Sequence, residues 1–288
     1  MSDKRWIPEM LHDRLGIRMF LRAERMICEI DTSHQRLELF QNKRFGKTLV
    51  LDGITQITTR DAFVYSEMMS HVPVFAHGSA ERVLIVGGGD CSIACEVLKH
   101  PAVKCVTQVE IDPAVVEFAR NYFPEFSRPV FADKRFESVI GDGMEYAAET
   151  ERHFDVIIVD SSDPQGPSRV LFSKKFYAAC KRCLTERGVL VTMNGVPFLQ
   201  PDELLAIRHL RTLFPCSGCY IAAVPTYVGG HLAMGWASTL ELPDIALETI
   251  TERQAAAGNF ATRYWTPKVH QASFALPRFI EEIIRRSR

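Results

Sequence analysis

The chain has 288 residues, of which 47% are hydrophobic and 24% are charged. These values are typical of a globular enzyme with a substantial core, and the length allows one large domain with an attachment or two small domains. The formal net charge of −1 excludes a whole-protein field that attracts nucleic acid, so a local site must select any charged ligand.

The first ten residues, MSDKRWIPEM, contain acids and a proline where a secretory signal needs an apolar core. No apolar run in the chain approaches the roughly 20 residues that a membrane span requires. We therefore expect a cytoplasmic protein with no membrane partner, whose eight cysteines are thiols.

Residues 1–58 are expected to form a small β domain. In RLELFQNKRFGKTLVLDGITQITT, short alternating runs are interrupted at NKRFG and at LDG, which predicts hairpins. Residues 60–77 then have helical periodicity, and Pro73 is expected to close this helix. His71 and His77 flank the expected helix end, where capping or solvent exposure is favoured over catalysis.

Residues 59–288 are expected to form a second domain of the α/β class, because predicted strands alternate with helical segments. The run DVIIVD is apolar through its centre, as is typical of a strand covered on both faces of a parallel sheet. The sequence therefore predicts a doubly wound sheet preceded by the small β domain. The predicted strands are residues 82–87, 105–111, 135–140, 154–160 and 188–194.

Two CxxC pairs have to be weighed as a zinc site. Cys180 and Cys183 lie in a segment with helical periodicity, and Cys216 and Cys219 border the apolar run CYIAAVP. Neither pair sits on the tight, glycine-bearing turn that zinc ribbons use. Buried thiols acting as small apolar residues are the favoured interpretation, and no metal site is predicted.

Three consecutive glycines follow the first predicted strand of the α/β domain, in VLIVGGGD. Glycines such as Gly87 and Gly88 allow a ligand to approach the backbone closely at the start of the next helix. Glu110 closes the second strand, where an acid can accept hydrogen bonds from both ribose hydroxyls. Asp142 follows the third strand, where it could accept a hydrogen bond from an adenine amino group. These three signals on successive strands predict a nucleoside site.

Asp90 follows the glycines directly and defines which nucleoside can bind. The pattern GxGxxG is absent, and the carboxylate would repel a pyrophosphate, so a dinucleotide is disfavoured. An adenosine attached to a sulfonium remains, as in the methyltransferase type of Rossmann fold. Since Asp90 would also repel the carboxylate of S-adenosylmethionine, the ligand that fits is decarboxylated S-adenosylmethionine.

The fourth predicted strand ends in the acidic stretch DSSD, which contains Asp160 and Asp163. Active sites of α/β proteins lie at this end of the strands, so these acids could form a cluster with Asp90. On its own, DSSD is also typical of a turn or a helix cap. Clustered acids need compensation by protons or cations, and either magnesium or a ligand with several ammonium groups would supply it.

Taken together, these motifs resemble those of the spermidine synthases (polyamine aminopropyltransferases) over nearly the whole chain. The resemblance implies transfer of an aminopropyl group from decarboxylated S-adenosylmethionine to putrescine, which yields spermidine and methylthioadenosine. It also implies no tightly bound cofactor, no nucleic-acid partner, and assembly as a homodimer or homotetramer. The stretches that carry the resemblance are LDGITQITTRDAFVYSEMMSHVP, VLIVGGGD, VEID, GDGMEY, DSSDPQGP, LFSKKFYAACKRCL, VPTYVGG and RYWTPKVHQASFALP.

The resemblance also implies roles for individual residues. It assigns Asp90 to the aminopropyl ammonium of the donor, and makes Asp160 the proton acceptor, supported by Tyr65 or Tyr227. The nucleoside contacts that it implies, next to the glycine turn, are Gln35, Glu110, Asp142, Gly143 and Pro167. The acceptor-side residues that it implies, in addition to the two tyrosines, are Gln56, Asp160, Ser161, Ser162 and Asp163.

Three departures from the family pattern leave the acceptor amine open. Ser66 stands where the family has His or Gln against the acceptor amine. Cys91 and Ser92 replace small residues, usually glycine, after the aspartate, which would crowd the aminopropyl end. Arg169 lies in the expected gate loop, where solvent exposure is the favoured interpretation. Cadaverine, agmatine or spermidine are therefore alternative acceptors, and a methyltransferase or a non-catalytic polyamine- or nucleoside-binding relative are alternative functions.

Overall fold

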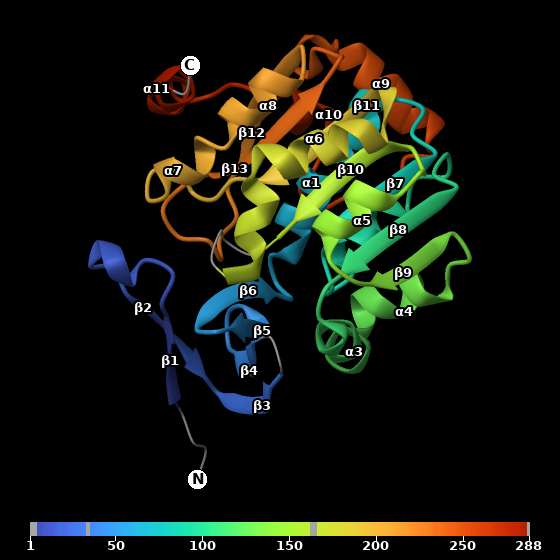
Figure 1. Ribbon diagram of the computed structural model, residues 1–288. Helices are drawn as coiled ribbons and strands as arrows, with labels where there is room; N and C mark the ends of the chain where they lie inside the picture. Colours follow the sequence, from blue (N-terminus) through green and yellow to red (C-terminus); the bar gives the residue numbers. More distant parts are fainter. Residues whose placement is uncertain (1–4, 33–34, 162–165, 287–288) are drawn as a thin grey trace.

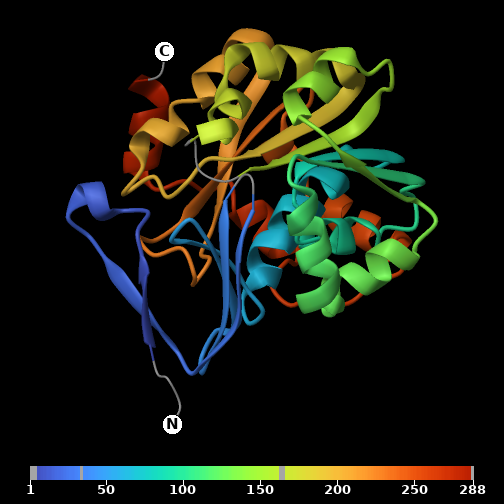
Figure 2. The same ribbon diagram turned by 60° about the horizontal axis from the view of Figure 1, so that its bottom comes forward.

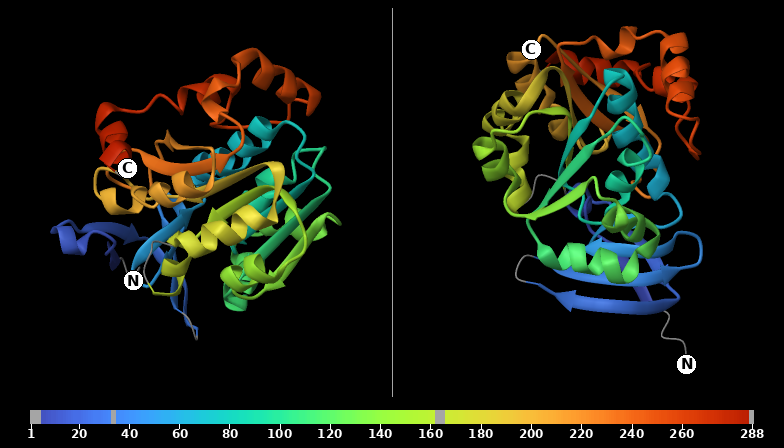
Figure 3. Two further views of the ribbon diagram at one scale, coloured as in Figure 1. Left: turned by 45° about the horizontal axis from the view of Figure 1, so that its top comes forward. Right: turned by 90° about the vertical axis from the view of Figure 1, so that its right-hand side faces the viewer.

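The computed structural model describes residues 5–32, 35–161 and 166–286. Its N-terminal part consists of two small antiparallel sheets, which lie together at one end of the molecule (Figures 1 and 3). The turn at Asp52 and Gly53 has positive φ at both residues, as a two-residue hairpin requires. Both hairpins predicted in this region are confirmed. The strands are β1 (Arg5–Glu9), β2 (Met19–Ala23), β3 (Arg25–Asp31), β4 (Arg36–Asn42), β5 (Gly46–Leu51) and β6 (Ile54–Thr58).

The second part is a seven-stranded sheet in the order β12-β13-β11-β10-β7-β8-β9. Its five predicted strands are confirmed and run parallel to one another. Two further strands complete the sheet beside β11, and β13 runs antiparallel to both of its neighbours. The strands are β7 (Arg82–Gly87), β8 (Cys105–Glu110), β9 (Phe136–Ile140), β10 (Phe154–Asp160), β11 (Leu184–Met193), β12 (Cys216–Ala222) and β13 (Leu232–Ser238).

Helices cover both faces of this sheet, as Figure 2 shows. Along β7, Val83 and Ile85 belong to one apolar core, and Leu84 and Val86 belong to the other. This alternation is the reason that the strand sequence is apolar throughout. The first core is covered by α1 (Ala62–His77), α2 (Ser92–Val97), α3 (Pro113–Tyr122), α4 (Pro124–Ala132), α9 (Leu247–Ala256) and α10 (Pro267–Ala272). The second is covered by α5 (Gly143–Glu149), α6 (Lys174–Cys183), α7 (Pro201–Leu204), α8 (Ile207–Leu213) and α11 (Arg278–Arg286).

The helix α1 differs from its prediction, because it continues through Pro73 and ends at Gly78 in the left-handed conformation. His71 and His77 are accordingly buried, so the expectation that they face solvent is wrong. His77 is the last residue of the helix, and its Nδ1 accepts a hydrogen bond of 3.3 Å from the backbone N–H of Ser79. A proline inside a helix costs about 3 kcal/mol. Almost every residue of α1 is buried, and this packing outweighs the cost.

Among the residues that the structure describes, no helix combines the length and the apolar character needed to span a bilayer. The two CxxC pairs occupy regular secondary structure. Cys180 and Cys183 are buried in α6, and Cys216 and Cys219 lie on β12.

Candidate active site

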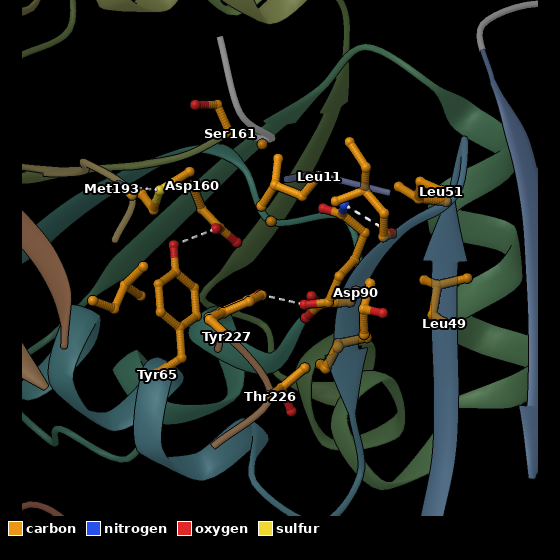
Figure 4. Close-up of a pocket in the computed structure, with 18 of the residues that line it drawn as sticks. Leu11, Leu49, Leu51, Tyr65, Asp90, Asp160, Ser161, Met193, Thr226 and Tyr227 are labelled. Atoms are coloured by element: carbon orange, nitrogen blue, oxygen red, sulfur yellow. Dashed lines mark hydrogen bonds between the residues drawn. The ribbon is translucent and has the colours of Figure 1, made fainter. Parts of the chain in front are cut away.

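A cavity of about 420 Å³ lies between the N-terminal β domain and the carboxyl ends of the parallel strands (Figure 4). Ligand sites of doubly wound sheets occur at this edge, where side chains at the ends of several strands converge. No lysine or arginine of the described residues lines the cavity, whereas seven acidic residues do. These are Glu9, Asp52, Asp61, Asp90, Glu110, Asp142 and Asp160.

The glycine turn after β7 brings the backbone into close contact with the end of β10. Gly87 has φ +85°, and a Cβ at this position would lie 1.9 Å from the carbonyl oxygen of Asp160. A Cβ on Gly88 would lie 3.3 Å from Oδ2 of the same aspartate. Glycine is therefore required at Gly87 for both conformation and space, and the turn leaves the Asp160 carboxylate open to the cavity.

Asp160 ends β10 and accepts a hydrogen bond of 2.6 Å from the hydroxyl of Tyr65 on α1 (Figure 4). Burial, with smaller contributions from the nearby charges of Asp90 and Glu110, raises the pKa of Asp160 from its ordinary 3.8 to about 7, and the hydrogen bond from Tyr65 opposes this shift. The pKa of Tyr65 is also raised by burial and by Asp160, so its hydroxyl stays protonated. A carboxyl group with this pKa can exchange a proton near neutral pH.

Asp90 follows the glycine turn and lines the cavity close to Asp160. Burial raises its pKa, and the backbone N–H of Ser92, at 2.6 Å, opposes that shift. Cys91 has φ +69°, and its fully buried side chain packs in the first core instead of lining the cavity. The expected crowding of the aminopropyl end by Cys91 is therefore absent from the structure.

Glu110 and Gln35 line another part of the cavity, and the buried Asp112 lies behind them. Glu110 ends β8, and burial raises its pKa. Gln35, in the turn between β3 and β4, donates through its amide nitrogen to Asp112 at 3.1 Å. The N-terminal domain thereby reaches the edge of the large sheet at the position where the sequence predicted ribose recognition.

Asp142 has a second structural role in addition to lining the cavity. Its carboxylate caps α5 by accepting hydrogen bonds from the backbone N–H groups of Met144 and Glu145, at 2.6 and 3.3 Å. Gly143 packs so closely on β7 that a Cβ would lie 2.3 Å from the side chain of Val86.

The remaining predicted residues lie in different places. Tyr227 and Gln56 both line the cavity, and the Tyr227 hydroxyl donates to the backbone carbonyl of Gln56. Ser66 does not join them, because it is buried in α1 and its hydroxyl donates to the carbonyl of Ala62 at 2.9 Å.

Around the predicted gate loop, Ser161 lines the cavity and Arg169 is exposed, as expected. Ser162 and Asp163 lie outside the described residues, as does the side chain of Pro167.

The sequence prediction missed two buried acids, Asp61 and Asp112. Each follows a strand of its sheet and precedes a helix, which is the usual position of a helix cap. No sequence motif shows that their carboxylates also accept hydrogen bonds from segments that are distant in the chain.

The strand order, the helices on both faces and the acid-lined cavity at the strand ends define a Rossmann-like enzyme of the class I methyltransferase type with an added N-terminal β domain. Residues 62–247 match the family model described as the spermine/spermidine synthase domain, and residues 6–59 match the spermidine synthase tetramerisation domain. The chain belongs to the spermine/spermidine synthase family.

Curated relatives and solved structures agree with this family. A polyamine aminopropyltransferase of Ruegeria sp. is 49% identical, with 98% of this chain and 99% of the relative covered. Polyamine aminopropyltransferase 1 of Pseudomonas aeruginosa is 47% identical, with 99% and 98% covered.

Two crystal structures of spermidine synthases have similar folds. One, in complex with the transition-state analogue AdoDATO, has a TM-score of 0.92 at 35% identity, with 99% of this chain and 97% of that chain covered. The other, from Thermotoga maritima, has a TM-score of 0.89 at 34% identity, with 99% and 96% covered.

The predicted family, fold class and enzyme class are therefore confirmed. The protein is an aminopropyl-transferring enzyme of polyamine biosynthesis, and its N-terminal match supports an oligomeric assembly.

Proposed function

We propose that this enzyme transfers the aminopropyl group of decarboxylated S-adenosylmethionine to putrescine, which yields spermidine and methylthioadenosine. The observation that carries the proposal is the charge of the cavity, which is lined by seven acidic residues and by no lysine or arginine of the described chain. Such a cavity favours reactants that carry only positive charge and disfavours a ligand with its own carboxylate.

On the donor side, we assign the ribose to Gln35 and Glu110 and the adenine to Asp142 and Gly143. Asp90 then faces the aminopropyl end, where its carboxylate pairs with the donor ammonium. Ordinary S-adenosylmethionine would place a carboxylate near Asp90 in a buried site, and this repulsion supports the decarboxylated form.

On the acceptor side, Asp160 is the proposed base. A primary alkyl amine is protonated at neutral pH and cannot attack carbon in that form. Asp160 accepts the ammonium proton, and Tyr65 orients the carboxylate by its 2.6 Å hydrogen bond. The raised pKa of Asp160, about 7, suits a group that takes up and releases a proton near neutral pH.

The reaction itself is a single in-line displacement. A bond forms between the amine nitrogen and the carbon next to the sulfonium, while the carbon–sulfur bond breaks and its electron pair neutralises the sulfur. The leaving group needs no acid because sulfur already carries positive charge. The protein contributes positioning, proton removal and exclusion of water. We include Gln56, Tyr227 and the segment beginning at Ser161 in the acceptor channel, and residues 1–58 as an oligomerisation domain.

The proposal is tested with purified protein, decarboxylated S-adenosylmethionine and a panel of amines, with products measured by mass spectrometry. Putrescine is expected to give spermidine and methylthioadenosine with the highest kcat/KM. Asp160→Asn is expected to lower turnover by at least about 100-fold while methylthioadenosine still binds in calorimetry. Absence of methylthioadenosine release with putrescine, cadaverine, diaminopropane, agmatine and spermidine would overturn the proposal, and a preference for another of these amines would reassign the acceptor.

A further inference from the structure

Asp61 occupies the N-cap position of α1, yet its carboxylate makes no capping hydrogen bond to that helix. The side chain is buried and lines the cavity. An aspartate at this position normally accepts a hydrogen bond from the first turn of its own helix. The carboxylate of Asp61 therefore makes its hydrogen bonds to groups outside the helix that it precedes.

The two oxygens of Asp61 hold segments from distant parts of the chain. Oδ1 accepts a hydrogen bond of 2.5 Å from the hydroxyl of Thr58 at the end of β6. Oδ2 accepts from the backbone N–H of Thr226 at 2.7 Å and from the hydroxyl of the same threonine. Thr226 lies in the loop between β12 and β13, so one carboxylate joins the corner of the N-terminal domain to the far edge of the large sheet.

Both segments carry a tyrosine of the acceptor side. Tyr65 lies in the first turn of α1, four residues after the N-cap Asp61, and both side chains line the cavity. Tyr227 is the immediate neighbour of Thr226. The two tyrosine rings meet edge to face with their centroids 6.3 Å apart, and Figure 4 shows them side by side, with Thr226 below Tyr227.

We propose that Asp61 is a positioning residue of the acceptor side, which fixes the loop of Tyr227 against the helix of Tyr65. Tyr65 in turn holds Asp160 by its hydrogen bond. Displacement of this loop would move the wall of the channel that aligns the amine with the reacting carbon. This inference rests on the proposed function, because that function places the amine beside Asp160.

Asp61 could instead act through its charge, by attracting an ammonium group of the amine directly. Asp61→Asn separates these two roles, since asparagine keeps an oxygen for Thr226, and its amide can donate to the hydroxyl of Thr58. Asp61→Ala removes both the charge and the hydrogen bonds. Thr226→Val removes the hydroxyl bond but leaves the charge of Asp61 in place.

Asp112→Ala is the matched control, because Asp112 is also a buried acid that holds a distant segment. Its carboxylate accepts from Ala114 in α3 and from Gln35 in the turn between β3 and β4. This control acts on the nucleoside side of the cavity through Gln35, so it is expected to weaken binding of the donor and of methylthioadenosine.

The experiment measures steady-state kinetics for the amine and, by calorimetry, binding of methylthioadenosine. We expect Asp61→Ala to lower kcat/KM for the amine by about 10- to 100-fold, because small misplacement of reacting groups has effects of this size. Thr226→Val should act in the same direction by a smaller factor, and Asp61→Asn should stay within about 5-fold of the wild type. Binding of methylthioadenosine should be unchanged in all three variants, which also shows that they are folded.

Two results would overturn the inference. If Asp61→Asn lost as much activity as Asp61→Ala while Thr226→Val kept the wild-type rate, Asp61 would act through charge. If Asp61→Ala weakened methylthioadenosine binding as strongly as Asp112→Ala does, its role would be general support of the fold. Failure of the proposed function is distinct from both, because it would appear in the wild-type enzyme as absence of turnover.

Discussion

Asp160 lies half-buried in the cavity beside two other acids, Asp90 and Glu110, and this arrangement affects stability as well as chemistry. Because the pKa of Asp160 is about 7 in the folded protein and 3.8 without perturbation, the folded state binds a proton more tightly than the unfolded state. The stabilisation from this group is complete below pH 3.8 and is lost as pH rises through 7. At neutral and higher pH, the carboxylate therefore lowers the free energy of unfolding.

We therefore predict that Asp160→Asn is more stable than the wild type, although its turnover is expected to be lower. Asparagine removes the buried charge and keeps an oxygen that can accept from Tyr65. At pH 8, the free energy of unfolding without ligand should rise by on the order of 1–3 kcal/mol, and the difference should shrink toward pH 4. Denaturant unfolding at both pH values measures this, with Asp244→Asn at an exposed position as the control. A destabilised Asp160→Asn at pH 8 would contradict the prediction.

Individual residues differ in how far the sequence reveals their place in the site. Asp90, Glu110 and Asp160 follow or end strands with short, recognisable motifs, and the parallel sheet brings the ends of such strands together. Asp61 and Asp112 also lie between a strand and the helix that follows it. Their distant hydrogen-bond partners, however, are separated from them by 165 and 77 residues along the chain. Such contacts depend on the packing of two domains, which no local pattern encodes.

At the scale of elements, α1 and α2 are joined by a buried polar cluster behind the site. His71 of α1 contacts Nε2 of His100 through Nδ1 at 3.0 Å, and Glu96 of α2 through Nε2 at 3.2 Å. Burial lowers the pKa of both histidines, that of His100 well below 6.5, so the folded protein keeps them neutral. Their contribution to stability is present above pH 6.5 and is lost as pH falls below it, because the unfolded chain then binds protons more tightly.

We predict that His100→Gln reduces the acid sensitivity of the protein. Gln at this position keeps a donor for His71 but does not titrate. Between pH 7 and pH 5, the wild type should lose about 2 kcal/mol more unfolding free energy than the variant, although the variant is less stable at pH 7. Denaturant unfolding at both pH values measures the difference, and the exposed His153→Gln serves as the control. Equal losses in His100→Gln and the wild type would show that His100 does not carry this sensitivity.

Most strands of the large sheet could be predicted because the central strands β7 and β10 are covered on both faces and are apolar through their centres. The strands β12 and β13 could not, since CSGCYIA and LAMGWAS contain glycine, alanine and serine in place of β-branched residues. Their place in the sheet depends on tertiary packing, because β13 pairs with β11 and β12 pairs with β13. At Gly218 in β12, a Cβ would lie 3.0 Å from the indole of Trp236. The continuation of α1 through Pro73 also depends on tertiary packing. Burial of almost the whole helix outweighs the destabilising effect of a proline in its interior.

At the scale of the whole molecule, the N-terminal hairpin of β1 and β2 exposes large apolar side chains. Trp6, Leu15 and Phe20 are 61%, 54% and 50% exposed. The hairpin is a separate two-stranded sheet, and such sheets are marginally stable alone in water. Exposed apolar clusters of this kind mark protein–protein contacts, and this region matches a tetramerisation domain.

We therefore predict that charge on the hairpin dissociates the oligomer. Trp6→Glu combined with Phe20→Glu should reduce the mass measured by light scattering to that of a smaller species, because a buried carboxylate in an apolar interface costs several kcal/mol. Phe198→Glu is the control, since this phenylalanine is 72% exposed outside the N-terminal domain and should leave the mass unchanged. The active-site acids all belong to one chain, so the dissociated variant should still bind methylthioadenosine. If the double variant kept the wild-type mass while Phe198→Glu dissociated, the interface would lie on the C-terminal domain instead.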